Sequence, residues 1–259
     1  MARAFTRAVS PRLAQCELTH LERAPIDFET AAGQHDRYER AIEDAGYDLI
    51  RLPELPFHPD GVFVEDTALI LDGHAVITRP GALSRADETG STADGLAGHF
   101  ELHRIEHGFL DGGDVLRIER TLYVGRSTRT DTDGIAALLA VVRPLGFDVV
   151  EAKLRGCLHL KTGTTLAGPD AAGRPVLLYC PASIDAAQFA GVEPLAIAPS
   201  EPAAANCVRA GNSLILPGGN PRTADLLGSL GFKVVEVDVS ELQKAEAGVT
   251  CMSLIDDRD

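Results

Sequence analysis

The chain repeats a unit of two apolar runs joined by a turn, and this repetition limits its possible folds more than any other feature. Residues 63–80 contain two such runs around Asp72-Gly73, a dipeptide typical of β-hairpin turns. Residues 113–125 follow the same plan, and residues 206–217 follow it around a Gly-Asn turn. Similar units that recur along a chain indicate a repeat architecture.

A helix signal and a further strand signal follow the hairpins. Behind the second hairpin, apolar residues recur at helical spacing from Ile135 to Val142, and Thr130 or Asp131 can cap this helix. Residues 147–151 then resume as a strand. We expect equivalent helix and strand pairs at 30–45 with 47–51 and at 223–230 with 232–237.

Five such units fit the chain. Their equivalent points lie near Asp66, Asp114, Thr162, Asn206 and Cys251, which are 48, 48, 44 and 45 residues apart. Closing the units into a ring would protect the edges of their sheets. We therefore predict an α/β fold, a five-bladed pseudo-symmetric α/β propeller of ββαβ-type repeats, as one domain over residues 1–259. An open doubly wound sheet is the alternative, but strands that come in pairs favour the ring.

Composition excludes several classes of partner. The chain has 24 basic and 38 acidic residues and a net charge of −14, which argues against nucleic acid and permits a cationic ligand. No apolar run reaches the ~18 residues of a membrane span, and the N-terminus lacks an apolar leader, so we expect a cytoplasmic protein without a membrane partner. The five cysteines form no C-x-x-C pair and are expected to be reduced. Four of them fit small buried side chains: Cys16, Cys157, Cys180 and Cys207.

The junctions between the units carry the candidate reactive side chains. In a radial repeat these junctions converge on the central axis. They hold Asp60, Glu65, Asp66, Asp111, Asp114, His159, Lys161, Asn206 and Cys251.

A cysteine, a histidine and carboxylates in one place suit nucleophilic attack at an electrophilic carbon. A free thiol is only about 3% thiolate at pH 7, so ionising it costs about 2 kcal/mol, and carboxylates nearby raise that cost. A cationic substrate would neutralise the acids and favour the thiolate. A planar guanidinium, with its fork of N–H donors, is the cation that paired carboxylates match best.

Three histidines resemble a helical metal site, because His99, His103 and His107 are spaced at i, i+4 and i+8. The repeat instead places residues 100–105 in a strand. We therefore expect no metal ligation by this set.

Seven short motifs, in order over nearly the whole chain, carry a family resemblance. They are Phe63-Val-Glu-Asp-Thr67, Ile77-Thr-Arg-Pro-Gly81, Leu110-Asp-Gly-Gly-Asp114, Leu158-His-Leu-Lys-Thr-Gly163, Ala204-Ala-Asn-Cys207, Pro221-Arg-Thr223 and Val249-Thr-Cys-Met-Ser253. Together they resemble the dimethylarginine dimethylaminohydrolases, also called dimethylargininases, of the guanidine-modifying pentein superfamily. In that family a cysteine attacks the guanidino carbon of an N-methylated arginine and releases methylamine or dimethylamine. Water then hydrolyses the S-alkylthiouronium intermediate to citrulline.

The resemblance implies catalytic roles for three residues. Cys251 resembles the nucleophile, and His159 resembles the acid that protonates the leaving amine and then the base for water. Asp111 resembles the carboxylate that pairs with this histidine or with the guanidinium. The resemblance also implies a single catalytic domain that needs no cofactor.

It further implies a set of substrate contacts. Asp66 resembles the acid that binds the guanidinium nitrogens. Asp60 and Glu65 resemble residues that contact the substrate or that hold its contact residues in place. Arg85 and Arg129 resemble the cations that hold the carboxylate of the amino acid. Two backbone contacts to the substrate amine are implied at Leu18, on a lid between Gln15 and Pro25, and at Ala245.

Two alternatives and two accessory expectations stay open. The chain could instead deiminate arginine or agmatine with release of ammonia, since one methyl group is worth only about 0.8 kcal/mol. It could also be a non-catalytic module that binds guanidines, against which the intact Cys251, His159 and Asp111 argue.

We expect no resident metal. We do expect inhibition by zinc that bridges Cys251 and His159, because thiolate and imidazole are good zinc ligands. The expected partner is a small cationic amino acid, and a homodimer is the quaternary option.

Overall fold

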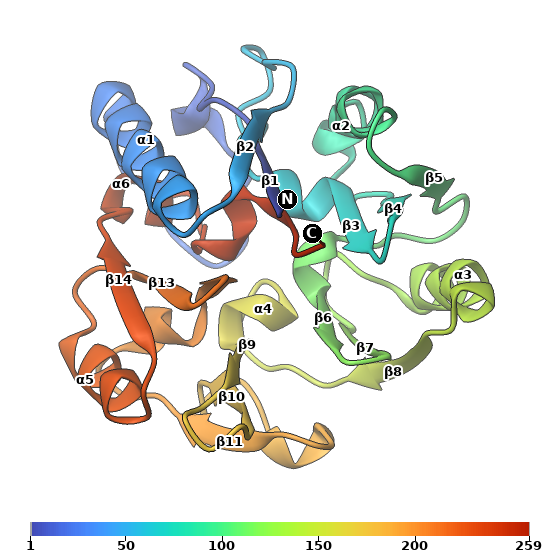
Figure 1. The fold of residues 1–259 in the computed structure, drawn as a ribbon. Helices are drawn as coiled ribbons and strands as arrows, with labels where there is room; N and C mark the ends of the chain where they lie inside the picture. Colours follow the sequence, from blue (N-terminus) through green and yellow to red (C-terminus); the bar gives the residue numbers. More distant parts are fainter. Residues whose placement is uncertain (1, 259) are drawn as a thin grey trace.

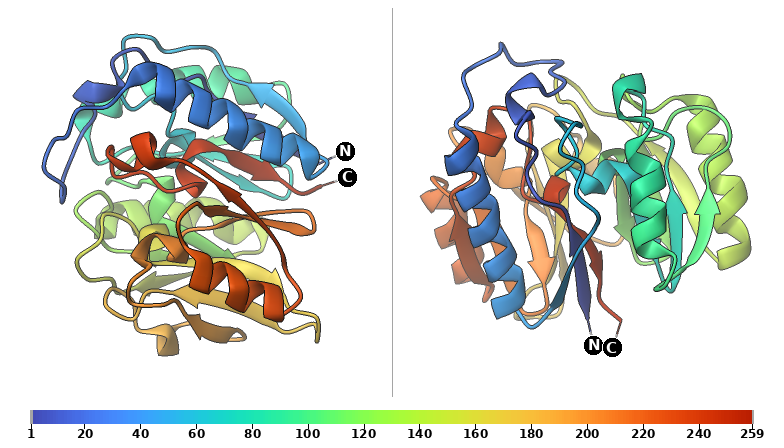
Figure 2. Two further views of the ribbon diagram at one scale, coloured as in Figure 1. Left: turned by 90° about the vertical axis from the view of Figure 1, so that its left-hand side faces the viewer. Right: turned by 90° about the horizontal axis from the view of Figure 1, so that it is seen from above.

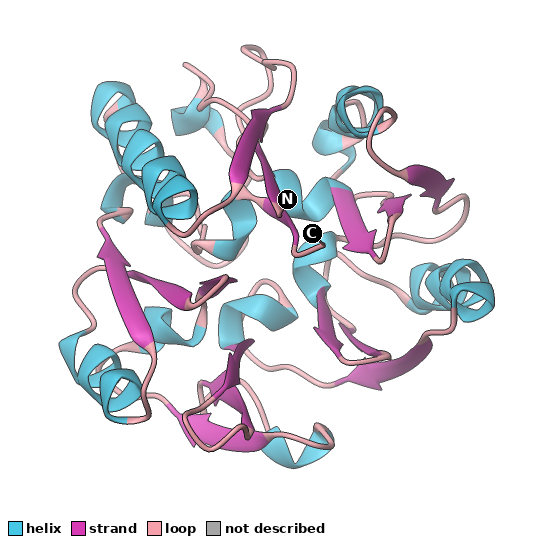
Figure 3. Ribbon diagram, viewed as in Figure 1, coloured by secondary structure: helices cyan, strands magenta, loops and turns pink. Residues whose placement is uncertain are grey.

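Residues 2–258 are described by the computed structural model, and they form five small β-sheets set around a central axis (Figure 1). Every sheet has three strands, of which the first two pair antiparallel and the third pairs parallel to the second. The predicted five-bladed α/β propeller is confirmed. The longer helices form an outer layer around the strands (Figure 3).

The strands and helices follow the order expected for five ββαβ units. The sheets are β15-β1-β2 (Leu254–Asp256, Arg3–Thr6, Asp48–Arg51), β3-β4-β5 (Ala68–Leu71, His74–Ile77, Glu101–Arg104), β6-β7-β8 (Val115–Ile118, Thr121–Gly125, Asp148–Ala152), β9-β10-β11 (Thr164–Pro169, Pro175–Tyr179, Glu193–Ala196) and β12-β13-β14 (Val208–Ala210, Ser213–Pro217, Lys233–Val237). The helices are α1 (Phe28–Asp44), α2 (Glu88–Leu96), α3 (Thr132–Val142), α4 (Leu160–Gly163), α5 (Pro221–Ser229) and α6 (Ser240–Gln243). None of these helices is long and apolar enough to cross a membrane.

Local chemistry sets the helix boundaries. Asp131 caps α3 as predicted, since its carboxylate accepts a hydrogen bond from the backbone N–H of Gly134 at 2.7 Å. Helix α1 begins two residues earlier than expected, because Asp27 provides the cap and accepts from Thr30 N–H at 2.7 Å. The unit of β9 to β11 departs from the prediction: only a short 3-10 turn, Ala186–Gln188, replaces its outer helix.

A short helical turn precedes the strand of each sheet that lies nearest the axis, and at Val64–Thr67 the sequence pattern had predicted strand. These turns pack against their neighbours around the axis, and each carries or adjoins one of the predicted reactive side chains. They are Val64–Thr67, Gly112–Asp114, α4, Pro202–Ala205 and Thr250–Met252. The five junctions therefore meet at one end of the ring, as the repeat predicts.

The apolar core lies between the blades rather than on the axis. Val76 of β4, for example, shares one cluster of buried side chains with Leu122 of β7 and Leu138 of α3. Leu178 of β10 and Leu216 of β13 share another. Each blade is therefore supported by its neighbours, and the axis is left for polar side chains.

The two ends of the chain close the ring together. Strand β1 pairs with β15 antiparallel, with Arg3 opposite Asp256, and the termini lie side by side (Figure 2). Arg3 Nη2 donates to Asp256 Oδ2 at 2.7 Å. This pairing brings the C-terminal turn that contains Cys251 back to the axis.

Candidate active site

A small cavity at the end of the ring that carries the junctions contains the predicted nucleophile. Cys251, His159 and Asp66 line it, and its volume is about 20 Å³. Such a volume holds roughly one water molecule. Further lining comes from the predicted Asp60, Arg85, Arg129 and Ala245, and from Glu17, Phe63, Leu158, Glu246 and Ala247, which the sequence analysis did not single out.

Cys251 lies in the turn Thr250–Met252, where Gly248 fixes its position. The Gly248 carbonyl accepts from Cys251 N–H at 3.3 Å, and Cys251 Sγ accepts from Gly248 N–H at 3.3 Å. Burial, together with the negative charges of Glu65 and Asp66, raises the pKa of Cys251 far above the usual range of a thiol. A neutral thiol is therefore the resting form, which is the direction expected from the sequence.

His159 precedes α4 and lies between two carboxylates. Its Nε2 is 3.0 Å from Asp111 Oδ2, and its Nδ1 is 3.8 Å from Asp66 Oδ1. Burial opposes a charge on the ring, but the charge of Asp66 and the hydrogen bond to Asp111 outweigh it and raise the pKa of His159 to about 9. The histidine is thus protonated at pH 7, and it holds the pKa of Asp66 below its usual value despite burial.

Asp111 supports His159 and is not exposed in the cavity. It is fully buried, and its Oδ1 accepts from Gly81 N–H at 2.8 Å while Oδ2 faces the imidazole. The sequence analysis left it between the histidine and the guanidinium. The structure pairs it with the histidine.

Gly113 allows the histidine and Asp66 to approach each other. Its N–H donates to Asp66 Oδ1 at 3.1 Å. A Cβ at this position would come within 2.7 Å of both Asp66 Oδ1 and His159 Nδ1. Only glycine leaves room for this contact.

Arg85 lines the small cavity and pairs with two buried acids. Its guanidinium lies 2.5 Å from Asp66 Oδ2 and 2.9 Å from Glu88 Oε2, and its role in holding the carboxylate of the substrate stays a prediction. It is only 4% exposed, and it also donates to the carbonyl of Phe63 at 2.8 Å. Arg85 therefore neutralises two buried carboxylates and orients the acid predicted to grip the guanidinium.

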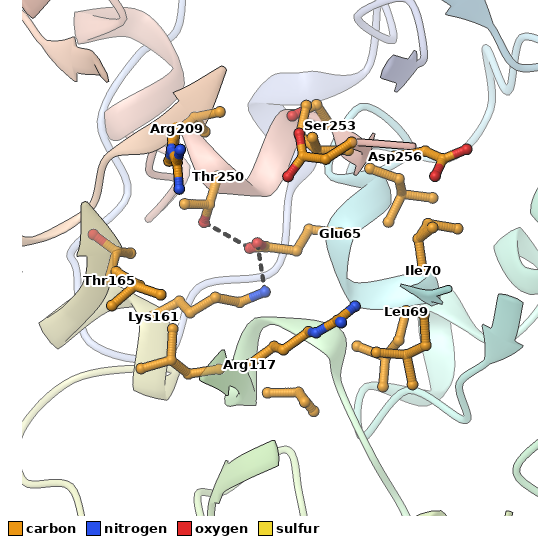
Figure 4. A pocket seen from close by; sticks show the side chains of 18 of the residues that line it. Glu65, Leu69, Ile70, Arg117, Lys161, Thr165, Arg209, Thr250, Ser253 and Asp256 are labelled. Atoms are coloured by element: carbon orange, nitrogen blue, oxygen red, sulfur yellow. Dashed lines mark hydrogen bonds and ion pairs between the residues drawn. The ribbon is translucent and has the colours of Figure 1, made fainter. Parts of the chain in front are cut away.

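Glu65 faces away from the small cavity. Its carboxylate accepts from Thr250 Oγ1 at 2.7 Å and pairs with Lys161 Nζ at 2.7 Å (Figure 4). These three residues line a larger cavity of about 510 Å³ between the inner strands. The neighbouring residues Asp66 and Cys251 line the small cavity instead, so Glu65 supports the site from behind and acts on the thiol through its charge.

The segment after Cys16 lies over the small cavity and is held there by hydrogen bonds. Glu246 accepts hydrogen bonds from the backbone N–H groups of Thr19 at 3.0 Å and of His20 and Leu21 at 2.5 Å. Its backbone has a φ of 59°, an uncommon conformation for a glutamate. A lid was predicted here, but the part played by Glu246 was not, because its position in the sequence carries no local signal.

Three further contacts join this segment to predicted site residues. Asp60 accepts from Glu17 N–H at 3.1 Å, and Arg129 Nη2 donates to Thr19 Oγ1 at 3.1 Å. Leu18 packs beside the apolar cluster that Cys251 also adjoins. Burial raises the pKa of Asp60 to about 6, although Arg85 and the Glu17 N–H counteract this.

One set of possible metal-ligand atoms lies at and just behind the cavity. Asp66, Asp111 and His159 each present one within 4.8 Å of the others. All three already hold contacts with one another or with Arg85. The arrangement therefore suits proton transfer and recognition of a cation.

The ring of five blades with a cysteine and a histidine at its axis defines a protein of the pentein superfamily. The chain matches no family model. It is 38% identical to the N(G),N(G)-dimethylarginine dimethylaminohydrolase of Streptomyces coelicolor, over 97% of this chain and 96% of the relative. The enzyme of the same name from Pseudomonas aeruginosa is 35% identical over 88% of this chain and 89% of its own length. The chain belongs to the dimethylarginine dimethylaminohydrolase family.

Solved structures agree with this assignment. A cysteine-to-serine variant of the Pseudomonas aeruginosa enzyme in complex with citrulline has a TM-score of 0.89, with 32% identity over 99% of this chain and all of its own. A histidine-to-glycine variant of a dimethylarginine dimethylaminohydrolase, as an adduct with S-methyl-L-thiocitrulline, has the same TM-score and 33% identity. The N-terminal domain of a cyanobacterial arginine dihydrolase, with a TM-score of 0.78 and 20% identity, shows the fold alone.

Proposed function

We propose that this protein hydrolyses N-methylated L-arginine, namely asymmetric dimethylarginine and monomethylarginine, to L-citrulline and dimethylamine or methylamine. The observation that carries the proposal is the cavity shared by Cys251, His159 and Asp66, with Asp111 behind the histidine. The named activity of the two bacterial relatives supports the same reaction. The reaction as proposed requires no cofactor.

Binding of the guanidinium prepares the nucleophile. Asp60 and Asp66 are acids of the cavity that attract the cation. The positive charge of the substrate lowers the pKa of Cys251, which burial and neighbouring acids otherwise raise, and the thiol proton leaves to solvent. Substrate binding therefore creates the thiolate that attacks.

His159 then moves one proton in each half of the reaction. The thiolate sulfur bonds to the guanidino carbon, and protonated His159 donates to the methylated nitrogen, so that the C–N bond breaks and the amine leaves. The neutral imidazole next accepts a proton from water, whose oxygen attacks the same carbon. The C–S bond breaks, and citrulline and the free enzyme result. Asp111 holds the ring throughout by its bond to Nε2.

A substrate panel tests the proposal. The purified protein is incubated with asymmetric dimethylarginine, monomethylarginine and free arginine, and citrulline is measured over time. We expect citrulline from the methylated forms and none from Cys251→Ser. Faster turnover of free arginine, or binding without citrulline, would overturn the proposed substrate.

The finer roles within the site are part of this proposal. Arg129 holds the carboxylate of the substrate, and the carbonyls of Leu18 and Ala245 accept from its amine. Arg85 holds the same carboxylate and also orients Asp66, while Glu65 supports the residues that contact the substrate. A single catalytic domain, a cytoplasmic location and a homodimer remain predictions.

Zinc is proposed as an inhibitor that binds Cys251 and His159. Both side chains line the small cavity. Activity is measured with added zinc and again after a chelator, which should restore it. Inhibition that persists in excess chelator would contradict this proposal.

A further inference from the structure

Two histidines and a glutamate far from the catalytic group meet on the β3-β4-β5 sheet. His74 begins β4, and Glu101 and His103 lie on the edge strand β5. Parallel pairing places His74 opposite Glu101. Residues two apart on a strand share a face, so the backbone itself directs all three side chains to one side of the sheet.

The ligand-type atoms of these side chains are spaced like those around a metal ion. His103 Nε2 lies 3.1 Å from His74 Nδ1 and 4.0 Å from Glu101 Oε1, and His74 Nδ1 lies 3.5 Å from Glu101 Oε2. Ligand atoms of a tetrahedral zinc ion, with bonds of about 2.0–2.1 Å, are roughly 3.3 Å apart. The two imidazole nitrogens and the Glu101 carboxylate thus lie at about the spacing of three ligands of such an ion, with one carboxylate oxygen near each nitrogen.

No other group in the described chain competes for these side chains. Glu101 forms no ion pair with a lysine or arginine among residues 2–258, and within the same residues the two imidazoles form hydrogen bonds or ion pairs only with each other and with this glutamate. The side chains of His74, His103 and Glu101 are 25%, 24% and 69% exposed. An ion can therefore reach them, and a water molecule has access to a fourth position.

We propose that His74, Glu101 and His103 form a binding site for one divalent transition-metal ion of the zinc class, with water as the fourth ligand. The site needs no catalytic residue and joins the edge strand β5 to β4. An ion that binds only the folded chain stabilises it by mass action. Zinc should therefore raise the melting temperature of the protein.

The test uses the full chain in a Cys251→Ser background, which removes the thiol of the active site as a ligand. Co²⁺ and Zn²⁺ are titrated by calorimetry, and the Co²⁺ complex is followed by its visible spectrum. We expect one saturable equivalent of metal, and a spectrum without a sulfur-to-cobalt charge-transfer band. Zinc should raise the melting temperature in this background.

Substitutions locate the ion. His74→Ala and His103→Ala should each weaken binding at least about tenfold, because loss of even a hydrogen-bond partner of a ligating histidine typically costs that much. Glu101→Gln, at an exposed position, should weaken binding without disturbing the fold. His107→Ala, which removes an exposed histidine nearby, is the matched control and should bind like the parent.

Melting curves without metal show whether each variant is folded. A folded His74→Ala, His103→Ala or Glu101→Gln variant that binds as tightly as the His107→Ala control would overturn the proposal. So would the absence of saturable binding in the Cys251→Ser parent.

Discussion

At the scale of single residues, His159 holds a charge that burial alone would remove. Burial alone would lower its pKa. The negative charge of Asp66 and the hydrogen bond to Asp111 have the larger effect and raise the pKa from 6.5 to about 9. A raised pKa means that protonation favours the folded state. His159 therefore adds its full contribution to the free energy of unfolding below pH 6.5, and this contribution is lost as the pH rises through 9. Its size is on the order of 3 kcal/mol.

His159→Asn should remove this pH dependence. The free energy of unfolding in urea, measured from about pH 6 to pH 9, should fall more steeply for the wild type than for the variant. His107→Asn, at an exposed position, provides the control. Equal slopes for the wild type and His159→Asn would show that the histidine is not charged in the folded protein.

Replacing the two arginines of the cavity should have different effects, one on the stability of the fold and the other on substrate binding. Arg85 is buried against Asp66 and Glu88, and losing it leaves two buried carboxylates without their cation. Arg85→Met should therefore lower the melting temperature by on the order of 10 °C, from a loss of about 3–5 kcal/mol. Arg129→Met should instead raise KM with little change in melting temperature, because the half-buried side chain of Arg129 donates, among residues 2–258, to Thr19 alone. A stable Arg85→Met protein with raised KM alone would show that Arg85 serves to hold the substrate rather than to support the fold.

The sequence was a good guide to which residues form the site. It was a poorer guide to which of these side chains bond to one another. Cys251, His159 and Asp66 share the cavity because the repeat places all three at junctions. The ion pair of Arg85 with Glu88 could not be predicted, because Glu88 lies one helical turn on and signals only a solvated helix start.

At the scale of elements, the segment that covers the cavity must move before an amino acid can enter. The cavity of about 20 Å³ is far below the roughly 300 Å³ or more of an ordinary ligand pocket. Glu246 holds this segment by accepting three backbone N–H groups, and its neighbour Ala245 lines the cavity. The hydrogen bonds of Glu246 thus oppose substrate entry and favour closure.

Glu246→Gln should weaken the closed state, because hydrogen bonds to a charged acceptor are about twice as strong as those to a neutral one. The rate at which a bulky alkylating reagent modifies Cys251 should rise several-fold, and kcat and KM should change together. Glu22→Gln, in the same segment at an exposed position, should leave both unchanged. An unaltered alkylation rate in Glu246→Gln would show that this carboxylate does not hold the lid.

The sequence pattern was informative for strands and helices and weaker for their ends. Apolar alternation predicted the hairpins, but it did not distinguish the turn Val64–Thr67 from the strand that follows. The contacts of Glu246 with Thr19 join residues 227 positions apart, so no local pattern could reveal them. The cluster of His74 and His103 depends in the same way on strand register.

At the scale of the whole molecule, the ring closes through its termini. Strands β1 and β15 pair within one sheet, and the side chains of Arg3 and Asp256 form an ion pair. Because the chain ends are adjacent and each blade rests on its neighbours, the order of the blades along the chain should matter little for the fold.

A circular permutant tests this view. The ends are joined by a short flexible linker, and new termini are opened between Ala172 and Gly173, in the exposed turn between β9 and β10. The permutant should fold with a modestly lower melting temperature and keep its activity. A cut after Met252, which removes β15, is the contrasting variant and should prevent cooperative folding. An unfolded permutant, or a folded truncation, would contradict the closure.

In the proposed mechanism, Cys251 attacks the guanidino carbon and stays bonded to it until water arrives. The most direct measurement is the mass of the intact protein after rapid acid quench during turnover of asymmetric dimethylarginine. We predict a transient adduct with the mass of the substrate minus dimethylamine, located by peptide mapping on Cys251 and absent in Cys251→Ser. Citrulline formation without any such adduct, or an adduct on another residue, would contradict the account.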